Sequence, residues 1–225
     1  MSSIDHTDTH IGPAGGYDHP PGGFYARYGK SLFDFLLALL IVPVIAPVII
    51  LLWLLVRRDG GPGFFAHPRV GRNGKVFLCW KLRTMVPDAA AQLARLLEED
   101  PDAAAQWDSE RKLMNDPRIT PLGDFLRRTS LDELPQIWNV LRGEMSFVGP
   151  RPVTRLELHK YGHARADYKA LKPGITGLWQ VSGRNSLSYD ERVALDSAYG
   201  DLRSLRTDLR VLGLTVFAVL GKTGC

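Results

Sequence analysis

Residues 35–56 read FLLALLIVPVIAPVIILLWLLV, a run of 22 residues without a charged side chain. At about 1.5 Å per residue, one straight helix of this length measures roughly 33 Å, enough to cross a hydrocarbon core about 30 Å thick. Few helices of soluble proteins are apolar on every face, so a buried core helix is disfavoured. The run therefore predicts a helix embedded in a membrane.

Two features of this run favour a re-entrant helix over one that crosses the bilayer. Pro43 and Pro47 lie near its middle, and each removes a backbone hydrogen bond and bends the helix. Arg27 and Lys30 precede the run and two arginines at 57–58 follow it, whereas a spanning helix concentrates Lys and Arg on one side. We expect a Pro-kinked re-entrant helix with both ends on the cytoplasmic face, and a plain transmembrane helix is the alternative.

The helix divides the chain of 225 residues into three predicted parts. Residues 1–23 are rich in Gly, Pro, Asp and His, which predicts a disordered tail, and they lack the order of a signal peptide. Residues 24–58 hold the membrane helix and its flanks. Residues 59–225 are long enough for one small domain with a core of its own, which we expect to be cytosolic.

Local patterns in residues 59–225 predict a mostly helical α+β domain. Asn73-Gly74 between two apolar runs predicts a β-hairpin. Helices are predicted over 88–114, around 154–169 and from Tyr189 to Leu220, while residues 171–185 have the composition of loop and strand. The last helix ends in an apolar stretch suited to burial or to a bilayer surface.

Composition narrows the class of partner. The formal net charge of +4 suits an anionic partner such as a membrane surface, a nucleotide or a phosphorylated lipid. Basic residues alternate with acidic ones and no nucleic-acid-reading motif is present, so we expect no nucleic-acid partner. Cys79 and Cys225 form no disulfide framework and no zinc spacing, which indicates a reducing compartment.

Residues 130–136, SLDELPQ, place Asp132 and Glu133 side by side before an apolar helical stretch. In a structural interpretation, Ser130 and Glu133 form a capping box, or Asp132 is the cap and Pro135 lies in the first turn. In a chemical interpretation, a carboxylate at a helix N-terminus has a depressed pKa, stays ionised, and holds Mg²⁺ or attacks phosphorus. These seven residues alone leave both interpretations open.

Cations and glycine-rich loops near the pair favour the chemical interpretation. Arg151 lies between two prolines in GPRPV, and a guanidinium held in this way suits a bidentate grip on phosphate. The loops GPRP, KPGITG and SGRN bring backbone N–H groups that are able to approach an anion. The other arginines on nearby or loop-like segments are Arg127, Arg128, Arg142 and Arg184.

Four stretches of the sequence resemble those of a known family. The stretches KLRTM (81–85), NDPRIT (115–120), LRRTSLDELPQIWNVLRGEMSFVGPRP (126–152) and KPGITGLWQVSGRN (172–185) resemble the bacterial sugar transferases, monotopic polyprenyl-phosphate hexose-1-phosphate transferases. The resemblance runs from about Tyr28 to Leu220 and is strongest to enzymes that begin exopolysaccharide repeat units with galactose-1-phosphate. It implies location at the bacterial inner membrane, with the catalytic domain on the cytoplasmic face.

The resemblance also implies a reaction and roles for residues. A sugar-1-phosphate moves from a UDP-sugar to undecaprenyl phosphate and UMP is released, with downstream glycosyltransferases as further partners. Asp132 is the expected nucleophile that forms a phosphosugar intermediate; Mg²⁺ lies near it, and Glu133 supports positioning or proton handling. The residues expected to bind phosphate or substrate are Lys81, Arg83, Arg127, Arg151, Arg184 and Asn185.

Several points stay open in the sequence. The family's re-entrant helix often bends at Ser-Pro, whereas this chain has Ala46-Pro47 and the additional Pro43. A non-catalytic, membrane-anchored assembly protein of a polysaccharide pathway is the alternative function. The sequence decides neither the sugar nor the oligomeric state. For Asp196 and Asp208 a position on a helix surface or as a cap is favoured, and a position at the site is the alternative.

Overall fold

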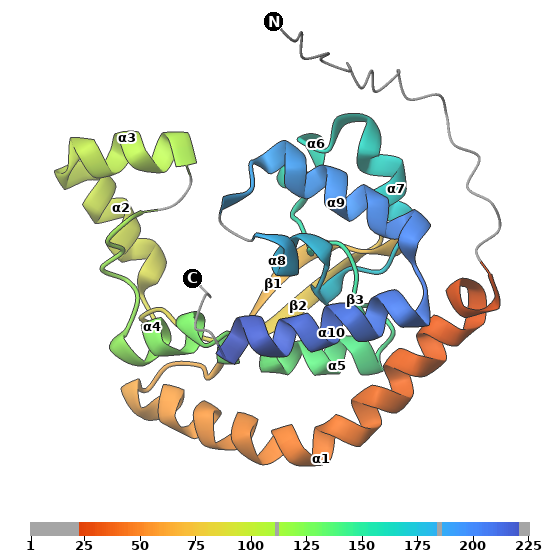
Figure 1. Ribbon diagram of the computed structural model, residues 1–225. Coiled ribbons are helices and arrows are strands. Elements are labelled where there is room, and N and C mark those ends of the chain that lie inside the picture. Colours follow the sequence, from red (N-terminus) through yellow and green to blue (C-terminus); the bar gives the residue numbers. More distant parts are fainter. Residues whose placement is uncertain (1–22, 111–112, 184–185, 221–225) are drawn as a thin grey trace, which may run out of the picture.

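The computed structural model describes residues 23–110, 113–183 and 186–220 (Figure 1). Helices predominate in this part of the chain, with two small two-stranded sheets. The predicted tail lies outside the described residues except for Gly23. The elements are α1 (Lys30–Val56), β1 (Phe64–Val70), β2 (Val76–Leu82), α2 (Ala89–Glu99), α3 (Pro101–Glu110), α4 (Pro121–Arg128), the 3₁₀ helix η4 (Leu131–Gln136), α5 (Ile137–Leu141), β3 (Ser146–Val148), α6 (Arg155–His159), α7 (Arg165–Ala170), β4 (Gly174–Thr176), α8 (Leu178–Ser182), α9 (Tyr189–Leu202) and α10 (Leu205–Leu220).

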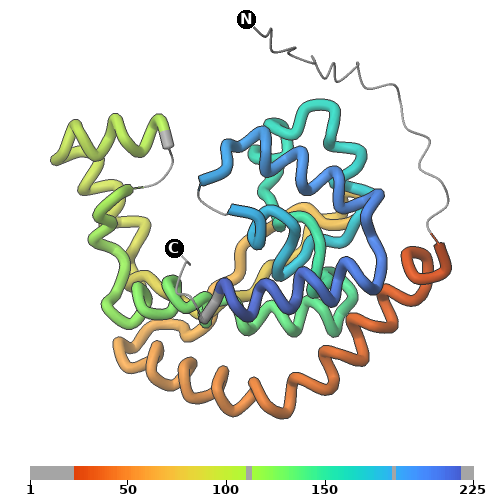
Figure 2. Tube along the Cα trace, viewed as in Figure 1, coloured from red at the N-terminus to blue at the C-terminus, as the bar shows by residue number. Residues whose placement is uncertain are grey.

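The predicted membrane helix is α1, and it follows a π-helical turn at Tyr25–Gly29. Pro43 and Pro47 lie inside it, and Figures 1 and 2 show it as an arc along one side of the molecule. Many of its apolar side chains are exposed, among them Leu40 at 73% and Val44 at 72%. With its flanking turns the helix is 35 residues long, and by length and composition it is able to cross a membrane.

The predicted β-hairpin is confirmed. Strands β1 and β2 pair antiparallel from Phe64 opposite Leu82 to Val70 opposite Val76. Asn73 takes a positive φ of 58° in the turn, which Asn tolerates better than most residues. The hairpin is therefore a rigid support that carries Lys81 near its open end and Arg72 at its turn.

The main hydrophobic core joins α1 to the rest of the chain. Ala38 of α1 is fully buried, and the neighbouring Leu37, Ile41 and Ile45 pack against the same cluster. The other buried members come from the hairpin, α5, β3, α9 and α10 and from short connections: Phe77, Cys79, Ile137, Val140, Met145, Phe147, Val148, Leu171, Tyr199 and Val211. The helix and the domain consequently fold around one shared core.

Two of the glycine loops meet where β3 pairs parallel with β4. The Gly149 N–H donates to the Thr176 carbonyl (2.9 Å), and the Gly174 N–H donates to the Pro150 carbonyl (2.8 Å). A Cβ on Gly174 would lie 2.2 Å from the Gly149 nitrogen, so only glycine permits this approach. The N–H groups of Gly149 and Gly174 each donate to a carbonyl of the other loop. The expectation that they face an anion is therefore wrong for these two glycines.

Each of the three long predicted helices is interrupted. Residues 88–114 divide at Pro101, where the Asp100 carboxylate caps α3 by accepting from the backbone N–H groups of residues 102 and 103. Residues 154–169 divide near Gly162, whose φ is +53°. Residues 189–220 divide before Ser204, which caps α10 through the N–H of residue 207. The short helix α8 lies within the segment expected to be loop and strand.

Both ends of α1 are fixed to the same folded domain. At the N-terminal end, Lys30 Nζ lies 2.9 Å from Asp208 Oδ2 of α10 and donates to Ser146 Oγ of β3 (2.5 Å). At the C-terminal end, Arg83 donates to the Val56 carbonyl (3.1 Å). Asp208 is fully buried, so its expected place on a helix surface or as a cap is wrong. The domain therefore holds the helix at both of its ends.

Candidate active site

The Asp132–Glu133 pair lies in η4, immediately before α5. Ser130 precedes it with a φ of +56° and makes no capping hydrogen bond through its side chain. Asp132 lies inside the 3₁₀ helix rather than at a cap position, and only 7% of its surface is exposed. Pro135 is accommodated within η4, before α5 begins. Neither capping interpretation holds, so the two carboxylates need another explanation.

The partner of the pair is Lys81 of β2. Its Nζ donates to Glu133 Oε1 (2.7 Å) and lies 3.5 Å from Asp132 Oδ2. Burial alone would lower the pKa of Lys81, but the carboxylates of Glu133 and Asp132 outweigh it and the pKa is raised. The cation is consequently held in its charged form between two acids.

The electrostatic state of Asp132 differs from the sequence prediction. Burial raises its pKa above the ordinary value, Lys81 and Arg127 lower it, and the neighbouring Glu133 raises it further. The net direction is upward, so the expected depressed pKa is wrong. A helix N-terminus does not dominate here, since the carboxylate lies inside a short 3₁₀ helix and away from water.

Arg127 reaches the site from α4. Its Nε donates to Thr84 Oγ1 (2.9 Å), and its charge lowers the pKa of Asp132. Helix α4 comes close enough because residue 123 is glycine: a Cβ there would lie 1.9 Å from the Thr84 carbonyl oxygen. The sequence prediction named Arg127 but gave no role to Thr84 or Gly123, which set its position.

Asn139 is a further residue that the sequence interpretation missed. It is completely buried in α5, accepts from the Trp80 N–H (3.1 Å) and donates to the Leu78 carbonyl (2.8 Å). It thus fixes the helix after the pair to the strand that carries Lys81. The available signal was a polar side chain inside the apolar run IWNVL (137–141).

Arg83 was also predicted to bind phosphate or substrate, and its hydrogen bonds are to the chain itself. Arg83 is buried and donates to the carbonyls of Pro62, Met85 and Val56 and to Asp59. Its hydrogen bonds hold the end of α1, so we assign it a structural role rather than substrate binding. Arg184 and Asn185 lie outside the described residues.

Arg151 is exposed and lies over the indole of Trp179, with the guanidinium carbon 5.8 Å from the ring centre. Arg192 approaches the same ring at 5.0 Å. The loop with Arg151 is supported by Asp196, which is buried and accepts from Tyr161 Oη (2.8 Å) and from the Arg151 backbone N–H. The expected surface or cap position of Asp196 is therefore wrong.

Comparison with known proteins identifies the family of this chain. The model of the bacterial sugar transferase family matches residues 25–222. The chain belongs to the bacterial sugar transferase family. It is 50% identical over 199 residues to a UDP-galactose-lipid carrier transferase of Erwinia amylovora and 49% identical over 199 residues to an undecaprenyl-phosphate galactose phosphotransferase of Salmonella typhimurium, each alignment covering 88% of this chain and 42% of the relative. It is also 46% identical over 201 residues to the exopolysaccharide production protein ExoY of Rhizobium meliloti, covering 89% of this chain and 87% of the relative.

The chain thus spans about two fifths of the length of the first two relatives and most of the length of the third. The family match begins at the turn before α1 and includes the pair, Lys81 and Arg127. The long apolar helix α1 and the candidate site consequently belong to one family unit.

The described residues contain no group of three or more His, Cys, Asp or Glu side chains able to hold a metal ion. The pair itself offers two carboxylates. Mg²⁺ is commonly held by one or two carboxylates, while waters and substrate phosphates complete its shell. Asp132 and Glu133 therefore fit a Mg²⁺ ion that arrives with a phosphorylated substrate, in the neighbourhood of Lys81.

Proposed function

We propose that this sugar transferase moves a hexose-1-phosphate from a UDP-sugar to undecaprenyl phosphate through a covalent intermediate on Asp132. The observation that carries the proposal is the buried carboxylate of Asp132, held beside Lys81 and electrostatically coupled to Arg127. A carboxylate nucleophile with two cations nearby suits attack on a phosphoryl group. The product would be the first lipid-linked sugar of an exopolysaccharide repeat unit.

The reaction divides into two balanced displacements. A carboxylate oxygen of Asp132 attacks the sugar-bearing phosphorus, the bond to the bridging oxygen breaks, and UMP leaves with the electron pair. A phosphate oxygen of the polyprenyl acceptor then attacks the same phosphorus and restores the Asp132 carboxylate. Lys81 and Arg127 offset the charge on the phosphoryl oxygens in both steps. Mg²⁺, when bound, adds to this charge neutralisation.

Glu133 has a positioning role in this proposal. Its carboxylate accepts the short hydrogen bond from Lys81 (2.7 Å), whereas Lys81 lies 3.5 Å from Asp132. The lysine is thus held mainly by Glu133, and its contact with Asp132 is the longer of the two. This arrangement separates the residue that orients the cation from the residue that reacts.

The proposed location is the cytoplasmic face of the bacterial inner membrane, with α1 re-entrant. A helix that crossed the bilayer would separate its N-terminal end from the domain that follows it. Lys30 at that end instead contacts Ser146 and Asp208, and Arg83 contacts the other end at Val56. With both ends on one side, the apolar middle dips into the bilayer and the pair lies where soluble donor and lipid acceptor meet.

Galactose is the proposed sugar, because the two most similar relatives reported above carry galactose in their names. The test is release of UMP from UDP-galactose or UDP-glucose by purified protein with Mg²⁺ and undecaprenyl phosphate. We expect acceptor-dependent turnover that is faster with UDP-galactose. The matched pair of variants is Asp132→Asn and Asp124→Asn, because Asp124 is an exposed carboxylate on the nearby helix α4.

We expect Asp132→Asn to reduce UMP release to background and Asp124→Asn to leave it unchanged. Turnover by Asp132→Asn at the wild-type rate would contradict the role of Asp132. Absence of UMP release by folded wild-type protein with either donor would favour the alternative, a non-catalytic assembly protein anchored in the membrane.

A further inference from the structure

A basic pocket opens at the N-terminal end of α1, away from the Asp132–Glu133 pair. Its lining includes the hydroxyl side chains of Ser31 and Ser146. Five cationic side chains also line it: Arg27, Lys30, Arg72, Lys172 and Arg203. They come from both sides of the start of α1, the hairpin turn, the loop before β4 and the connection between α9 and α10.

The pocket is distinct from the candidate active site. Arg72 lies in the turn of the hairpin, whereas Lys81 lies near the open end of β2. Strand residues advance by about 3.3 Å, so Val76 and Lys81 are roughly 17 Å apart along the strand. Within the residues that the structure describes, the ion pairs of Asp132 and Glu133 are with Lys81, which does not line the pocket.

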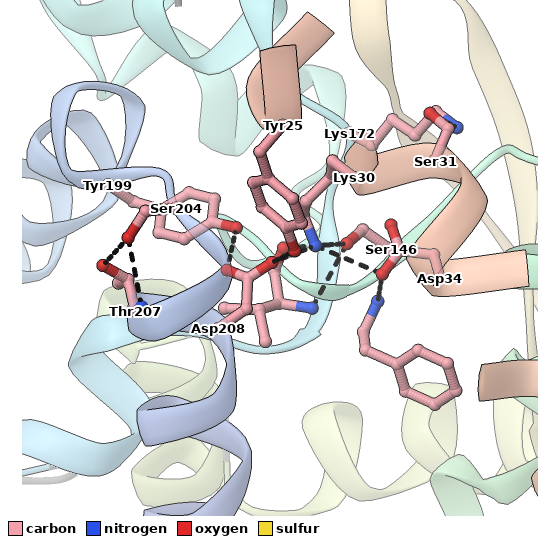
Figure 3. A network of polar contacts seen from close by, with 12 residues as sticks. Tyr25, Lys30, Ser31, Asp34, Ser146, Lys172, Tyr199, Ser204, Thr207 and Asp208 are labelled. Atoms are coloured by element: carbon pink, nitrogen blue, oxygen red, sulfur yellow. Dashed lines mark hydrogen bonds and ion pairs between the residues drawn. The ribbon is translucent and has the colours of Figure 1, made fainter. Parts of the chain in front are cut away.

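In the described part of the chain, one of these five cations, Lys30, is neutralised by carboxylates. Figure 3 shows Lys30 between Asp34 and Asp208, with Nζ–O distances of 3.1 and 2.9 Å, and with Tyr25 and Tyr199 donating to Asp208. This network explains why Lys30 is buried. It adds one net negative charge, which leaves most of the positive charge of the pocket uncompensated.

The other four cations form no ion pair with a carboxylate in the part of the chain that the structure describes. Lys172 donates to Ser31 Oγ (3.2 Å), a neutral partner. Arg203 Nε is buried without a hydrogen-bond partner. Burial lowers the pKa of Lys172, Asp34 opposes this, and Arg72 and Lys30 lower the pKa further. Like charges are thus gathered where an anion would relieve their repulsion.

We propose that this pocket binds a phosphate group, and that in the membrane the phosphate belongs to the headgroup of an anionic phospholipid. Exposed aromatic side chains at the same end of α1, Phe24 at 81% and Tyr28 at 57%, mark the level of the bilayer surface. Basic pockets at that level bind anionic headgroups. The inference rests on the proposed membrane anchoring of α1 and is independent of the transfer reaction.

The size of the pocket determines how the phosphate lies. Its enclosed part has a volume of about 20 Å³, room for about one water molecule. A phosphate group therefore lies at the mouth, reached by the longer side chains Arg72, Lys172 and Arg203, with the acyl chains free to run along the apolar surface of α1. A lipid held there would steady the start of the helix against the domain.

The test compares wild-type protein with the double variant Arg72→Gln/Lys172→Gln. Lys75→Gln is the matched control, because Lys75 is exposed beside the same turn and does not line the pocket. Thermal unfolding in neutral detergent is followed while dioleoyl phosphatidylglycerol, dioleoyl phosphatidylcholine or inorganic phosphate is added. We expect phosphatidylglycerol to raise the Tm of wild type and Lys75→Gln at a concentration about tenfold lower than phosphatidylcholine does, and the double variant to lose this preference.

Inorganic phosphate distinguishes the source of the ligand. Inorganic phosphate could raise the Tm of wild type as much as phosphatidylglycerol does and leave the double variant unchanged. That result would support the phosphate site but overturn the proposal that the phosphate belongs to a lipid. Equal responses of wild type and double variant to phosphatidylglycerol would overturn the site itself. Arg72→Lys/Lys172→Arg keeps both charges and should keep the lipid preference, which guards against a folding defect in the Gln variant. Flotation with phosphatidylcholine vesicles tests the anchoring separately, so that its failure is not mistaken for failure of the pocket.

Discussion

Asp132 is subject to opposing electrostatic influences. Burial and the adjacent Glu133 disfavour its ionised form, whereas Lys81 and Arg127 favour it, and the net pKa is raised. A nucleophilic carboxylate that is incompletely solvated keeps more of its reactivity than one surrounded by water. The two cations therefore have a double task in our proposal, since they keep Asp132 ionised and offset charge during transfer.

Replacement of Lys81 tests this balance. Because Lys81 lowers the pKa of Asp132, Lys81→Met should move the acid limb of the rate of UMP release to higher pH, and Lys81→Arg should largely preserve it. At neutral pH we expect Lys81→Met to be slower by roughly tenfold or more, since a hydrogen bond to a charged group contributes about 1.5–3 kcal/mol. An acid limb at the wild-type position in Lys81→Met would contradict the assigned role.

Asp196 gives a prediction about stability. Burial raises its pKa from 3.8 to about 7, although the Tyr161 hydroxyl and the Arg151 N–H act in the opposite direction. Between these values the folded protein holds a proton that the unfolded chain has lost, so the contribution of Asp196 to stability falls as pH rises. The Tm of Asp196→Asn relative to wild type should therefore increase between pH 5 and pH 8. A difference in Tm that does not change with pH would exclude this titration.

The motifs predicted which residues form the candidate site better than they predicted the surroundings of those residues. SLDELPQ and KLRTM directed attention to Asp132, Glu133 and Lys81, which the structure brings together. Asp196 and Asp208 looked like ordinary helix residues because their partners, Tyr161 and Lys30, are far away in the sequence. Burial and pKa depend on such distant neighbours, and local patterns contain no information about them.

At the scale of elements, the approach of α4 to residue 84 sets the position of Arg127. Gly123→Ala would place a Cβ 1.9 Å from a backbone oxygen that has no room to move aside. We expect a loss of stability of about 1–3 kcal/mol or more, together with reduced UMP release, because α4 must shift.

The matched control is Gly213→Ala in α10, where a Cβ meets no atom within 4 Å. It should be neutral or stabilising by up to about 1 kcal/mol, because Ala favours helix more than Gly does. Thermal unfolding of both variants in the same detergent measures the difference. Equal Tm values for the two variants would show that the close approach of α4 is not needed.

The elements also show how far the sequence predicts the fold. The long apolar helix and the hairpin followed from strong local signals, namely the uncharged run and Asn73-Gly74. The predicted helices were too long, because caps at Asp100 and Ser204 were overlooked within continuous helical patterns. The pairing of β3 with β4 joins residues about thirty positions apart and has no local signal.

At the scale of the whole molecule, our proposal fixes the orientation of the protein in the bilayer. Gly23→Cys and Arg58→Cys, each in a Cys225→Ser background, place one reactive thiol before and one after α1. Both positions are exposed, while Cys79 is buried. A maleimide that cannot cross membranes should label neither thiol in intact spheroplasts and both after permeabilisation. Labelling of the Gly23→Cys variant in intact spheroplasts would indicate a spanning helix instead.

The most direct test of our central claim is the intact mass of the purified protein after incubation with Mg²⁺ and UDP-galactose without lipid acceptor. We predict a mass increase of one hexose phosphate in wild type and Asp124→Asn, none in Asp132→Asn, and loss of the added mass when undecaprenyl phosphate is supplied. An adduct that persists in Asp132→Asn, or UMP release by wild type without any adduct, would contradict a covalent intermediate on Asp132.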